Sequence, residues 1–382
     1  MSVIVKSGGG KSGGLYIWKK YEVIHYLSFI GNEDFTLKTN NTTKNWDGTL
    51  EYSTDATTWS TWNGTEISSS GNNLYLRGTG NTKITGDSSN SNFIFTGTDT
   101  LKIACEGNIE NLLDYKTVSA GGHPTMAPSC YRTMFFNCTA LTTAPALPAT
   151  TLDAHCYYYM FSGCTSLTTA PALPATTLAY SCYDYMFKGC TALTTAPELP
   201  ATTLDVSCYS SMFEGCKSLT TAPELSATTL ASSCYRSMFR GCTSLTTAPE
   251  LPATTLAYSC YDDMFNGCTA LTTAPALPAT TLDAGCYSSM FEGCKSLTTV
   301  PELPATTLSN YCYWSMFNRC TKIKLSTTQT GDYQTAYKIP TSGTGTTATD
   351  ALLDMFANTG GTFTGTPEIN TTYYLSTSNT VV

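Results

Sequence analysis

Cysteine is the chemically reactive residue type whose spacing stands out first in this 382-residue chain, which contains 17 of them. All except Cys105 fall in pairs eight residues apart. Each pair recurs 26 residues later, from Cys130 and Cys138 to Cys312 and Cys320. Two thiols at this spacing could bind a metal ion, form a disulfide or pack as small core residues.

The spacing of the thiols does not favour a metal site. Zinc sites use closer pairs of Cys and His, and the chain has three histidines, His25, His123 and His155. We therefore expect no metal and no cofactor. A disulfide within a unit, such as Cys234 to Cys242, remains an alternative if the two Cα atoms lie within ~7 Å. The favoured interpretation is a pair of reduced core cysteines.

Other groups that could support catalysis are sparse. Asp262 and Asp263 form a paired carboxylate, but the position varies between units, which indicates a solvated face. The segment 8–12 contains Gly-Lys-Ser without the rest of a phosphate-binding loop. The segment 53–59 is similar to an Asp-box hairpin but lacks its glycine, and such a hairpin would be structural. We predict no catalytic residues and no enzyme activity.

Aromatic side chains are the better candidates for a binding surface. One tyrosine recurs in every unit, from Tyr131 to Tyr313. These rings could stack on sugars, but lateral packing in the core is the favoured interpretation. Additional aromatic residues appear in some of the units, where they are predicted to be exposed. The candidate ligand-binding residues are Tyr158, Tyr159, Tyr180, Tyr185, Tyr258 and Trp314.

The composition limits the class of protein. Apolar residues make up 41% of the chain and charged residues 13%, so the surface must be rich in hydroxyl groups. A net charge of -8 and the absence of a basic patch argue against nucleic-acid binding. The N-terminal residues 1–14 lack the apolar stretch of a signal peptide, and no apolar run is long enough to cross a membrane. Release by cell lysis would bring such a protein to a surface without export.

One repeat unit predicts one coil of a stack. The Thr-rich segment 244–248 is typical of a short strand, and Pro249 ends it because proline cannot donate to a sheet. After an extended turn, Leu256 returns to the core. The segment 260–265 is predicted to be a helical turn, closed by Gly267. Strands of eight stacked units would form a sheet roughly 40 Å long, with ends that need capping.

Differences between the units should mark the exposed positions. The two residues after each Cys-Tyr read Arg-Thr, Tyr-Tyr, Asp-Tyr, Ser-Ser, Arg-Ser, Asp-Asp, Ser-Ser and Trp-Ser. A position that accepts Asp, Arg and Tyr within one array is predicted to be solvated. The threonine pairs, from 142–143 to 298–299, repeat unchanged. One threonine of each pair is predicted to face outward.

The repeat resembles the BspA-like leucine-rich repeats of gut bacteria and their phages, over about residues 108 to 360. The resemblance rests on the phrase MFxGCTSLTTAPELPATTLAxxCYxxMF, in which the Ala-Pro-Glu segment makes the unit slightly longer than usual. The opening GLYIWKKYEV and the closing TDALLDMFANTGGTFTGTPEINTTYY also resemble gut phage or prophage proteins. The resemblance implies a solenoid with a surface or virion role, and it implies no catalytic residues.

The flanking segments complete an α+β repeat architecture: a small antiparallel β-sandwich-like domain, then a leucine-rich-repeat solenoid of eight 26-residue units with a degenerate C-terminal cap. Short strands are predicted at 23–29, 35–38, 50–53, 74–77, 93–95 and 101–104. In the cap, Ala351 and Thr359 replace the two cysteines, 13 residues late, after an insertion around 329–337. The expected domains are a Gly-rich arm 1–14, a β domain 15–107, an N-terminal cap 108–129, the solenoid 130–320 and a C-terminal cap and tail 321–382.

These features favour a non-enzymatic, virion-associated surface protein of a gut phage. Its solenoid would adhere to a host glycan or protein, and its N-terminal region would bind other virion proteins. The Gly-rich arm is either a flexible linker or a segment that docks on a neighbouring subunit. Alternatives are a bacterial cell-surface adhesin and a purely architectural virion component. The expected location is the virion, or else the bacterial cell surface, and a homo-oligomer is possible.

Overall fold

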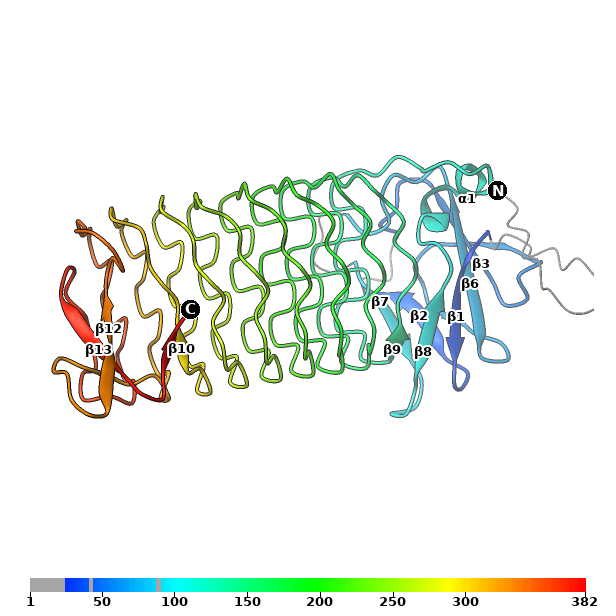
Figure 1. The fold of residues 1–382 in the computed structure, drawn as a ribbon. Helices are drawn as coiled ribbons and strands as arrows, with labels where there is room; N and C mark the ends of the chain where they lie inside the picture. The colour runs from blue at the N-terminus through cyan, green and yellow to red at the C-terminus, as the bar shows by residue number, and fades with distance from the viewer. Residues whose placement is uncertain (1–24, 41–43, 87–90) are drawn as a thin grey trace, which may run out of the picture.

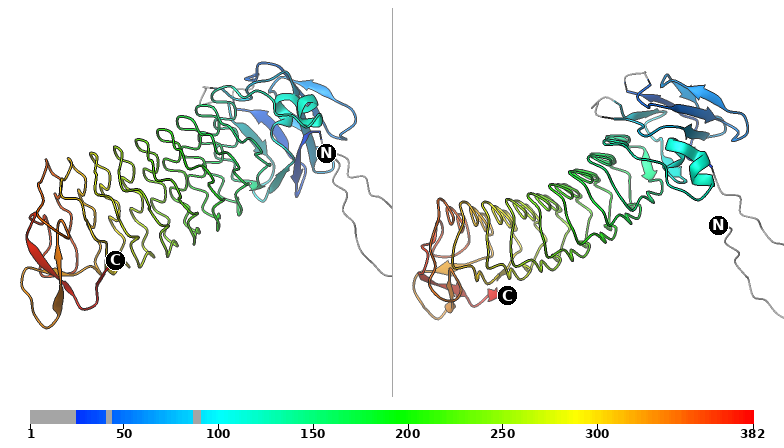
Figure 2. Two further views of the ribbon diagram at one scale, coloured as in Figure 1. Left: turned by 45° about the horizontal axis from the view of Figure 1, so that its top comes forward. Right: turned by 90° about the horizontal axis from the view of Figure 1, so that it is seen from above.

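The structure is a computed structural model that describes residues 25–40, 44–86 and 91–382. The predicted arm 1–14 and the Gly-Lys-Ser segment lie outside these residues. A strand-rich N-terminal part leads into a long stack of coils, and small sheets close the far end (Figure 1). The stack is gently curved when seen from above (Figure 2).

Two sheets make up the N-terminal part. The first has the order β4-β3-β6-β1-β8-β9 and the second β5-β2-β7, with antiparallel pairing except between β8 and β9. The strands are β1 (Leu27–Gly31), β2 (Thr36–Thr39), β3 (Thr49–Ser53), β4 (Ser60–Trp62), β5 (Ile67–Ser68), β6 (Asn73–Thr79), β7 (Phe93–Thr96), β8 (Ile103–Glu106) and β9 (Leu141–Thr143). Each of the six predicted strands overlaps an observed one, whereas β4 and β5 carried too few apolar residues to be predicted.

The N-terminal sheets and the coils share one apolar core. Phe29 and Phe93, one from each sheet, lie with ring centroids 6.5 Å apart. Phe135 of the first coil contacts both rings, at 6.4 and 6.1 Å. Strand β8 also pairs in parallel with β9, which belongs to the first coil. The β domain is therefore a folded end of the stack.

A turn and a short helix cover the first coil. Helix α1 (Asn111–Ser119) follows the turn, and Leu112 and Leu113 are fully buried beside Ile109. These are the three residues that the sequence assigns to an N-terminal cap. The structure confirms their burial.

In the N-terminal part, Asp55 accepts hydrogen bonds from the backbone N–H groups of Thr57 and Thr58, so the Asp-box-like segment forms a local turn.

In every coil, the segment predicted to be a helical turn adopts a structure other than a helix. Its backbone N–H groups alternate between two kinds of acceptor. Phe239 donates to the carbonyl of Met264 in the next coil at 3.0 Å, whereas Met238 donates to Tyr235 within its own coil at 3.2 Å. An α-helix would satisfy all of these groups within one segment. The helical prediction is therefore wrong, and the segment is a run of tight turns, hereafter the turn run.

Left-handed backbone at every fourth residue causes this departure from the helix. Ser233, Ser237 and Gly241 have φ values of 55°, 53° and 71°. The same three positions are left-handed in the equivalent residues of neighbouring coils. Residues with a Cβ atom adopt this conformation at an energetic cost of about 1 kcal/mol, which helix-forming segments avoid. Serine and glycine at these positions are the sequence feature that distinguishes the turn run from a helix.

Replacing Gly241 by valine should destabilise the fold by about 1–2 kcal/mol, since a β-branched residue is strained at positive φ. A Cβ atom at this position would lie 3.8 Å from the Cα of Gly215, which is ordinary contact, so strain and not a clash sets the penalty. Asparagine, which occupies the equivalent position 137 with φ 56°, should cost less. Urea denaturation measures the difference. Gly331→Ala, in open space without positive φ, is the control. Equal losses in the valine and asparagine variants would contradict the explanation.

The predicted strand over 244–248 is reduced to a single parallel bridge, such as Thr221 to Thr247. Within the described part of the array, assigned strands occur in the first coil (β9) and in β10 (Thr299–Val300). Coils are less tightly bonded on this side: Thr220 N lies 3.4 Å from Thr194 O, against 2.7 Å from Gly241 N to Asn266 O in the turn run. The prediction of a continuous sheet along the stack is therefore wrong. In each of the central threonine pairs both side chains are exposed, whereas one outward-facing threonine per pair was predicted.

Equivalent side chains form ladders through the core. The recurring tyrosines are at most 2% exposed, and neighbouring rings lie 5.7–5.9 Å apart. The phenylalanine rings stack at 5.4–5.8 Å. Core packing of the tyrosines is confirmed. Their hydroxyls were expected to reach solvent or backbone. Tyr131 does reach a carbonyl, but the hydroxyls of Tyr157, Tyr209 and Tyr313 are buried without a hydrogen-bond partner among the described residues.

All 17 cysteines are free and buried. The second cysteine of a unit donates its S–H to a phenylalanine carbonyl of the preceding coil, as from Cys242 to Phe213 at 3.1 Å. Burial raises the pKa of Cys242 to about 12, so the thiol stays protonated and unreactive. Each such cysteine acts as a small apolar residue with one weak donor.

The C-terminal residues close the stack. Phe356 continues the phenylalanine ladder at 5.4 Å from Phe317, and Ala351 replaces the first cysteine with 1% exposure. The insertion forms β12 (Tyr333–Lys338), which pairs with β13 (Thr372–Ser376) beside β11 (Leu325–Ser326). Strand β14 (Thr380–Val381) pairs with β10. The degenerate last coil is thus present, covered by three chain segments.

Candidate functional site

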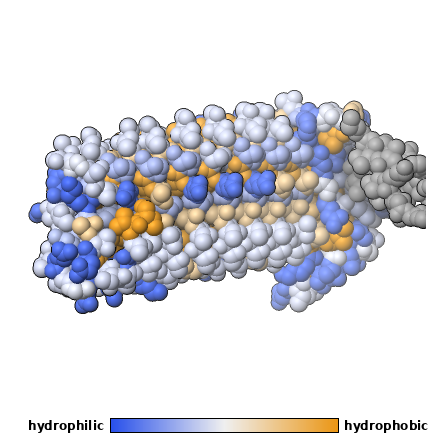
Figure 3. Space-filling model, viewed as in Figure 1, coloured by the Kyte–Doolittle hydropathy of each residue, from blue (hydrophilic) through white to orange (hydrophobic). Residues whose placement is uncertain are grey.

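The residues that differ between units line one side of the turn run. We call the two columns that follow Cys-Tyr the variable face. Its first column is Arg132, Tyr158, Asp184, Ser210, Arg236, Asp262, Ser288 and Trp314, and its second is Thr133, Tyr159, Tyr185, Ser211, Ser237, Asp263, Ser289 and Ser315. Space-filling shows side chains of like hydropathy in rows along the stack (Figure 3). Successive units therefore present equivalent positions in register.

The prediction that this face is fully solvated is wrong for several members. Asp184 is 7% exposed and the serines of the second column are largely buried. Asp262 and Asp263 are half-buried, and Asp262 pairs with Arg236 at 3.1 Å. Burial, followed by the charge of Asp263, raises the pKa of Asp262. The paired carboxylate belongs to an ion-pair network on the variable face.

Four of the six candidate aromatic residues gather in the early coils, three of them on the variable face and Tyr180 beside it. Tyr159 and Tyr185 stack with centroids 4.4 Å apart and planes 10° apart, and Tyr158 meets Tyr159 edge-on at 4.6 Å. The ring centroid of His155 lies 5.4 Å from that of Tyr158 and 4.9 Å from that of Tyr180, so His155 links the two tyrosines. We call these five residues the aromatic cluster. Its rings therefore contact one another along the early coils.

Two tyrosines of the cluster occupy strained backbone positions. Tyr159 and Tyr185 have φ values of 53° and 58°, where most equivalent residues are serine. A bulky residue at positive φ is an outlier that costs roughly 1–3 kcal/mol and often marks a functional position. The strain favours a role for this tyrosine pair beyond packing.

A buried carboxylate lies within the cluster. Asp184 follows Tyr158 in the first column. Burial raises the pKa of Tyr158 and Tyr159, and the charge of Asp184 adds to the increase. Its Oδ1 atom accepts no hydrogen bond from the described residues. Burial raises the pKa of Asp184 to about 7, although hydrogen bonding by Ser210 and Ser181 acts in the opposite direction. The site thus holds a carboxylate that titrates near neutral pH.

Two cations of the chain already lie against cluster rings. The guanidinium carbon of Arg132 lies 4.7 Å from the centroid of Tyr158, and the Lys188 ammonium lies 4.9 Å from that of Tyr185. Lys188 also pairs with Glu214 at 3.0 Å. The Nε atom of Arg132 is buried without a hydrogen-bond partner in the described structure. The rings therefore bind positive charge as well as one another.

The remaining two candidates lie in later coils. Tyr258 is 55% exposed and occupies the position equivalent to Tyr180, three units on. Trp314 is 41% exposed and ends the first column. Tyr311, 44% exposed, was missed although it interrupts a position that carries serine in most units, and that interruption is the signal that could have found it. The structure does not bring these three residues into the aromatic cluster.

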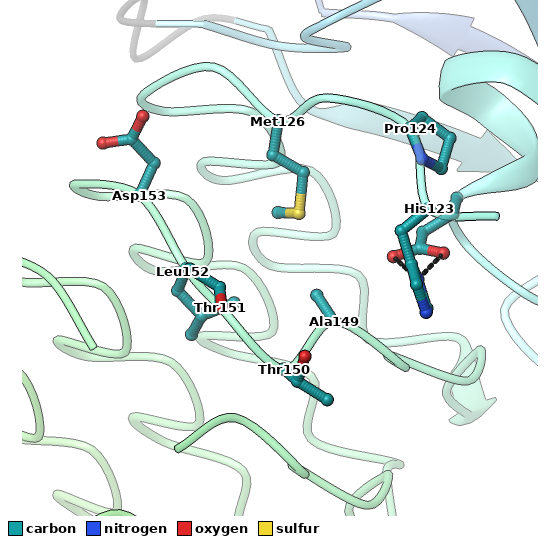
Figure 4. A pocket seen from close by; sticks show the side chains of 9 residues that line it. His123, Pro124, Met126, Ala149, Thr150, Thr151, Leu152 and Asp153 are labelled. Atoms are coloured by element: carbon teal, nitrogen blue, oxygen red, sulfur yellow. Dashed lines mark hydrogen bonds and ion pairs between the residues drawn. The ribbon is translucent and has the colours of Figure 1, made fainter. Parts of the chain in front are cut away.

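A separate hollow of about 370 Å³ lies where the N-terminal cap meets the first coils (Figure 4). Glu110, with a side chain only 1% exposed, binds Nδ1 of the exposed His123 at 2.8 Å. Met126 and Leu152 supply apolar lining on the other side. This Glu–His pair could not be predicted from the sequence, because its two residues belong to the cap and not to the repeat.

Among residues 25–40, 44–86 and 91–382, no three His, Cys, Asp or Glu side chains form a group that could hold a metal ion. In the same part of the chain, no helix has the length and apolar character needed to cross a membrane.

Comparison with known proteins identifies the repeat. The family model of the BspA type leucine rich repeat region, which contains six copies, matches residues 124–220 and 181–324. Together these matches span more than half of the chain. The chain belongs to the BspA-type leucine-rich repeat family. No curated protein and no solved structure matches it.

Membership of the BspA-type family indicates a surface- or adhesion-type repeat protein. The matched residues include the variable face and the aromatic cluster but end before the C-terminal sheets. In repeat proteins of this kind, stacked units present an extended surface to a partner. The variable face combines a constant backbone with side chains that differ from unit to unit.

Proposed function

We propose that this BspA-type repeat protein is a non-enzymatic adhesion protein that binds a host glycan or protein through its variable face. The observation that carries the proposal is the distribution of sequence differences. Residues in the core ladders are nearly invariant, whereas Tyr, Asp, Arg, Ser and Trp alternate along one face. Tyrosine, serine and arginine are also the residue types that dominate antibody binding surfaces, where rigid aromatic groups and adaptable hydroxyls combine.

The proposed architecture is an open solenoid of eight 26-residue units, capped at both ends. Ring stacking between residues 26 apart and the hydrogen bonds from the turn run to the next coil support it. Within this architecture the N-terminal region would attach the protein to other virion proteins, leaving the coils free to reach a host. We propose the phage virion as the location. A bacterial cell surface and a purely architectural virion role are the alternatives.

Adhesion can be tested with the whole chain and two matched variants. Tyr159→Ser with Tyr185→Ser introduces the residue found at most equivalent positions, and should reduce adherence to host cells at least tenfold. Thr246→Ser with Thr247→Ser alters an exposed threonine pair that is not part of the variable face, and should leave adherence unchanged. Binding of labelled protein to gut bacteria measures both. Adherence that survives the tyrosine changes but is lost with the threonine changes would contradict the proposal.

Location needs a separate measurement. Fractionation of induced cultures should recover the protein with purified particles. Its presence on growing cells without particles would instead favour the bacterial adhesin.

A further inference from the structure

We propose that the aromatic cluster and Asp184 bind a positively charged side chain, arginine or lysine, of the partner protein. The inference rests on the proposed function in one respect, because it takes the variable face as the binding surface. It specifies which part of that face makes the decisive contact and what chemical group is recognised there.

The first support is a buried carboxylate that has no counter-charge, although Ser210 and Ser181 hydrogen-bond to it. Asp184 is 7% exposed, forms no ion pair with any described residue, and leaves Oδ1 without a hydrogen-bond donor. A buried charge without a partner is costly unless a counter-charge is present. Most equivalent residues in the column are serine, arginine or a paired aspartate, so the fold itself does not need this carboxylate.

The second support is the behaviour of the surrounding rings. The face of a tyrosine ring attracts cations within ~6 Å of its centroid, and the attraction grows when water is excluded. Two of the cluster rings already hold a cation in this way: Tyr158 holds a guanidinium group and Tyr185 an ammonium group. These intramolecular cations are side chains of arginine and lysine. We therefore expect the cluster to bind the same chemical groups of a partner.

The charged groups around Asp184 leave room for this role. Lys188 and Arg236 lower its pKa by their charge, but both are bound to other carboxylates, Glu214 and Asp262. Arg132 lies against Tyr158, and Tyr158 and Tyr159 are the neighbouring phenols. A partner cation would therefore supply the missing counter-charge without displacing an existing ion pair.

Calorimetry on the full chain tests this with N-acetyl-arginine amide as the probe. Its neutral analogue, N-acetyl-citrulline amide, has nearly the same shape. We expect the cation to bind at least tenfold more tightly than the neutral analogue. Since Asp184 titrates near pH 7, binding to the carboxylate should release about half a proton at that pH, and the release should vanish by pH 9. Titration in buffers of different ionisation enthalpy measures this proton.

Asp184→Asn should remove the proton release and weaken binding of the cation at least tenfold. Asp283→Asn, at an exposed carboxylate distant in sequence, is the matched control and should change neither quantity. Equal binding of the two probes, or unchanged proton release in Asp184→Asn, would overturn the inference. So would tighter binding of choline than of the arginine probe, which would point to a headgroup and not a protein side chain.

The outcome can be separated from that of the proposed function. Binding of the arginine probe with proton release, in a protein that does not adhere to cells, would support the site and refute adhesion. Adherence that depends on Tyr159 and Tyr185, without any binding of the cation, would support adhesion and refute the site.

Discussion

Phe239→Ala is expected to destabilise the protein by about 3–5 kcal/mol, the range for removing a buried phenylalanine. Phe239 is fully buried, and its ring stacks on Phe213 at 5.8 Å and on Phe265 at 5.7 Å. The cavity left by alanine would face two coils at once. Neighbouring coils provide most of the stability of a repeat array, so the loss should also weaken the coils on either side.

Urea denaturation followed by circular dichroism measures the change in the free energy of unfolding. Limited proteolysis should show new cleavage close to residue 239, because the coils there open first. Thr246→Ala, at an exposed threonine of the same coil, is the control and should stay within about 0.5 kcal/mol. A loss below 1 kcal/mol for Phe239→Ala would show that the ring ladder does not hold the coils together.

Asp184→Asn is expected to stabilise the protein at pH 8 and to have little effect at pH 4. Burial raises the pKa of Asp184 from 3.8 to about 7 in the folded protein. The folded state then holds a proton that the unfolded state releases between these two pH values. Stability therefore falls as the pH rises from about 4 to about 7, and the full penalty, of order 4 kcal/mol before relaxation, is present above pH 7. Asparagine keeps the shape and cannot ionise.

The free energy of unfolding of wild type and variant should be compared at pH 4, 6 and 8. The difference between them isolates Asp184, since every other titrating group is common to both proteins. Asp283→Asn, at an exposed carboxylate, should show no such trend. A difference that stays constant with pH would mean that Asp184 is not buried as a neutral acid. Higher stability together with weaker binding of a cation would indicate a carboxylate kept for function.

The repeat and its core could be predicted from the sequence because packing follows from periodicity. A Leu, Met, Phe or Cys that returns every 26 residues must meet its own kind in a stack; the Met, Phe and Cys residues are buried, and the leucines are buried or partly buried. The caps were also predictable, since Ile109 and Ala351 continue the apolar pattern beyond the regular units. The aromatic candidates Tyr158, Tyr159, Tyr180 and Tyr185 were found because they interrupt positions that are otherwise small or polar.

The backbone between the ladders was not predictable in the same way. Cys260 and Met264 are four residues apart, which suits a helix, yet left-handed residues such as Asp263 turn the chain at every fourth residue. Periodicity of side chains does not reveal the sign of φ for Ser or Asp, which adopt either sign. Burial of Asp184 was missed for a related reason. A position that carries arginine in one coil and serine in another is solvated or buried according to the bulk of its neighbours.

The hydrogen bonds of the turn run connect each coil to the next in the same manner throughout the array. A duplication of one 26-residue unit could therefore be inserted between any two coils without new types of contact. Each insertion would lengthen the stack by one ring spacing, 5.7–5.9 Å, and add one pair of residues to the variable face. Unequal recombination within the gene could thus change the length of the array and the set of side chains on the variable face in a single event, while both ends remain unaltered.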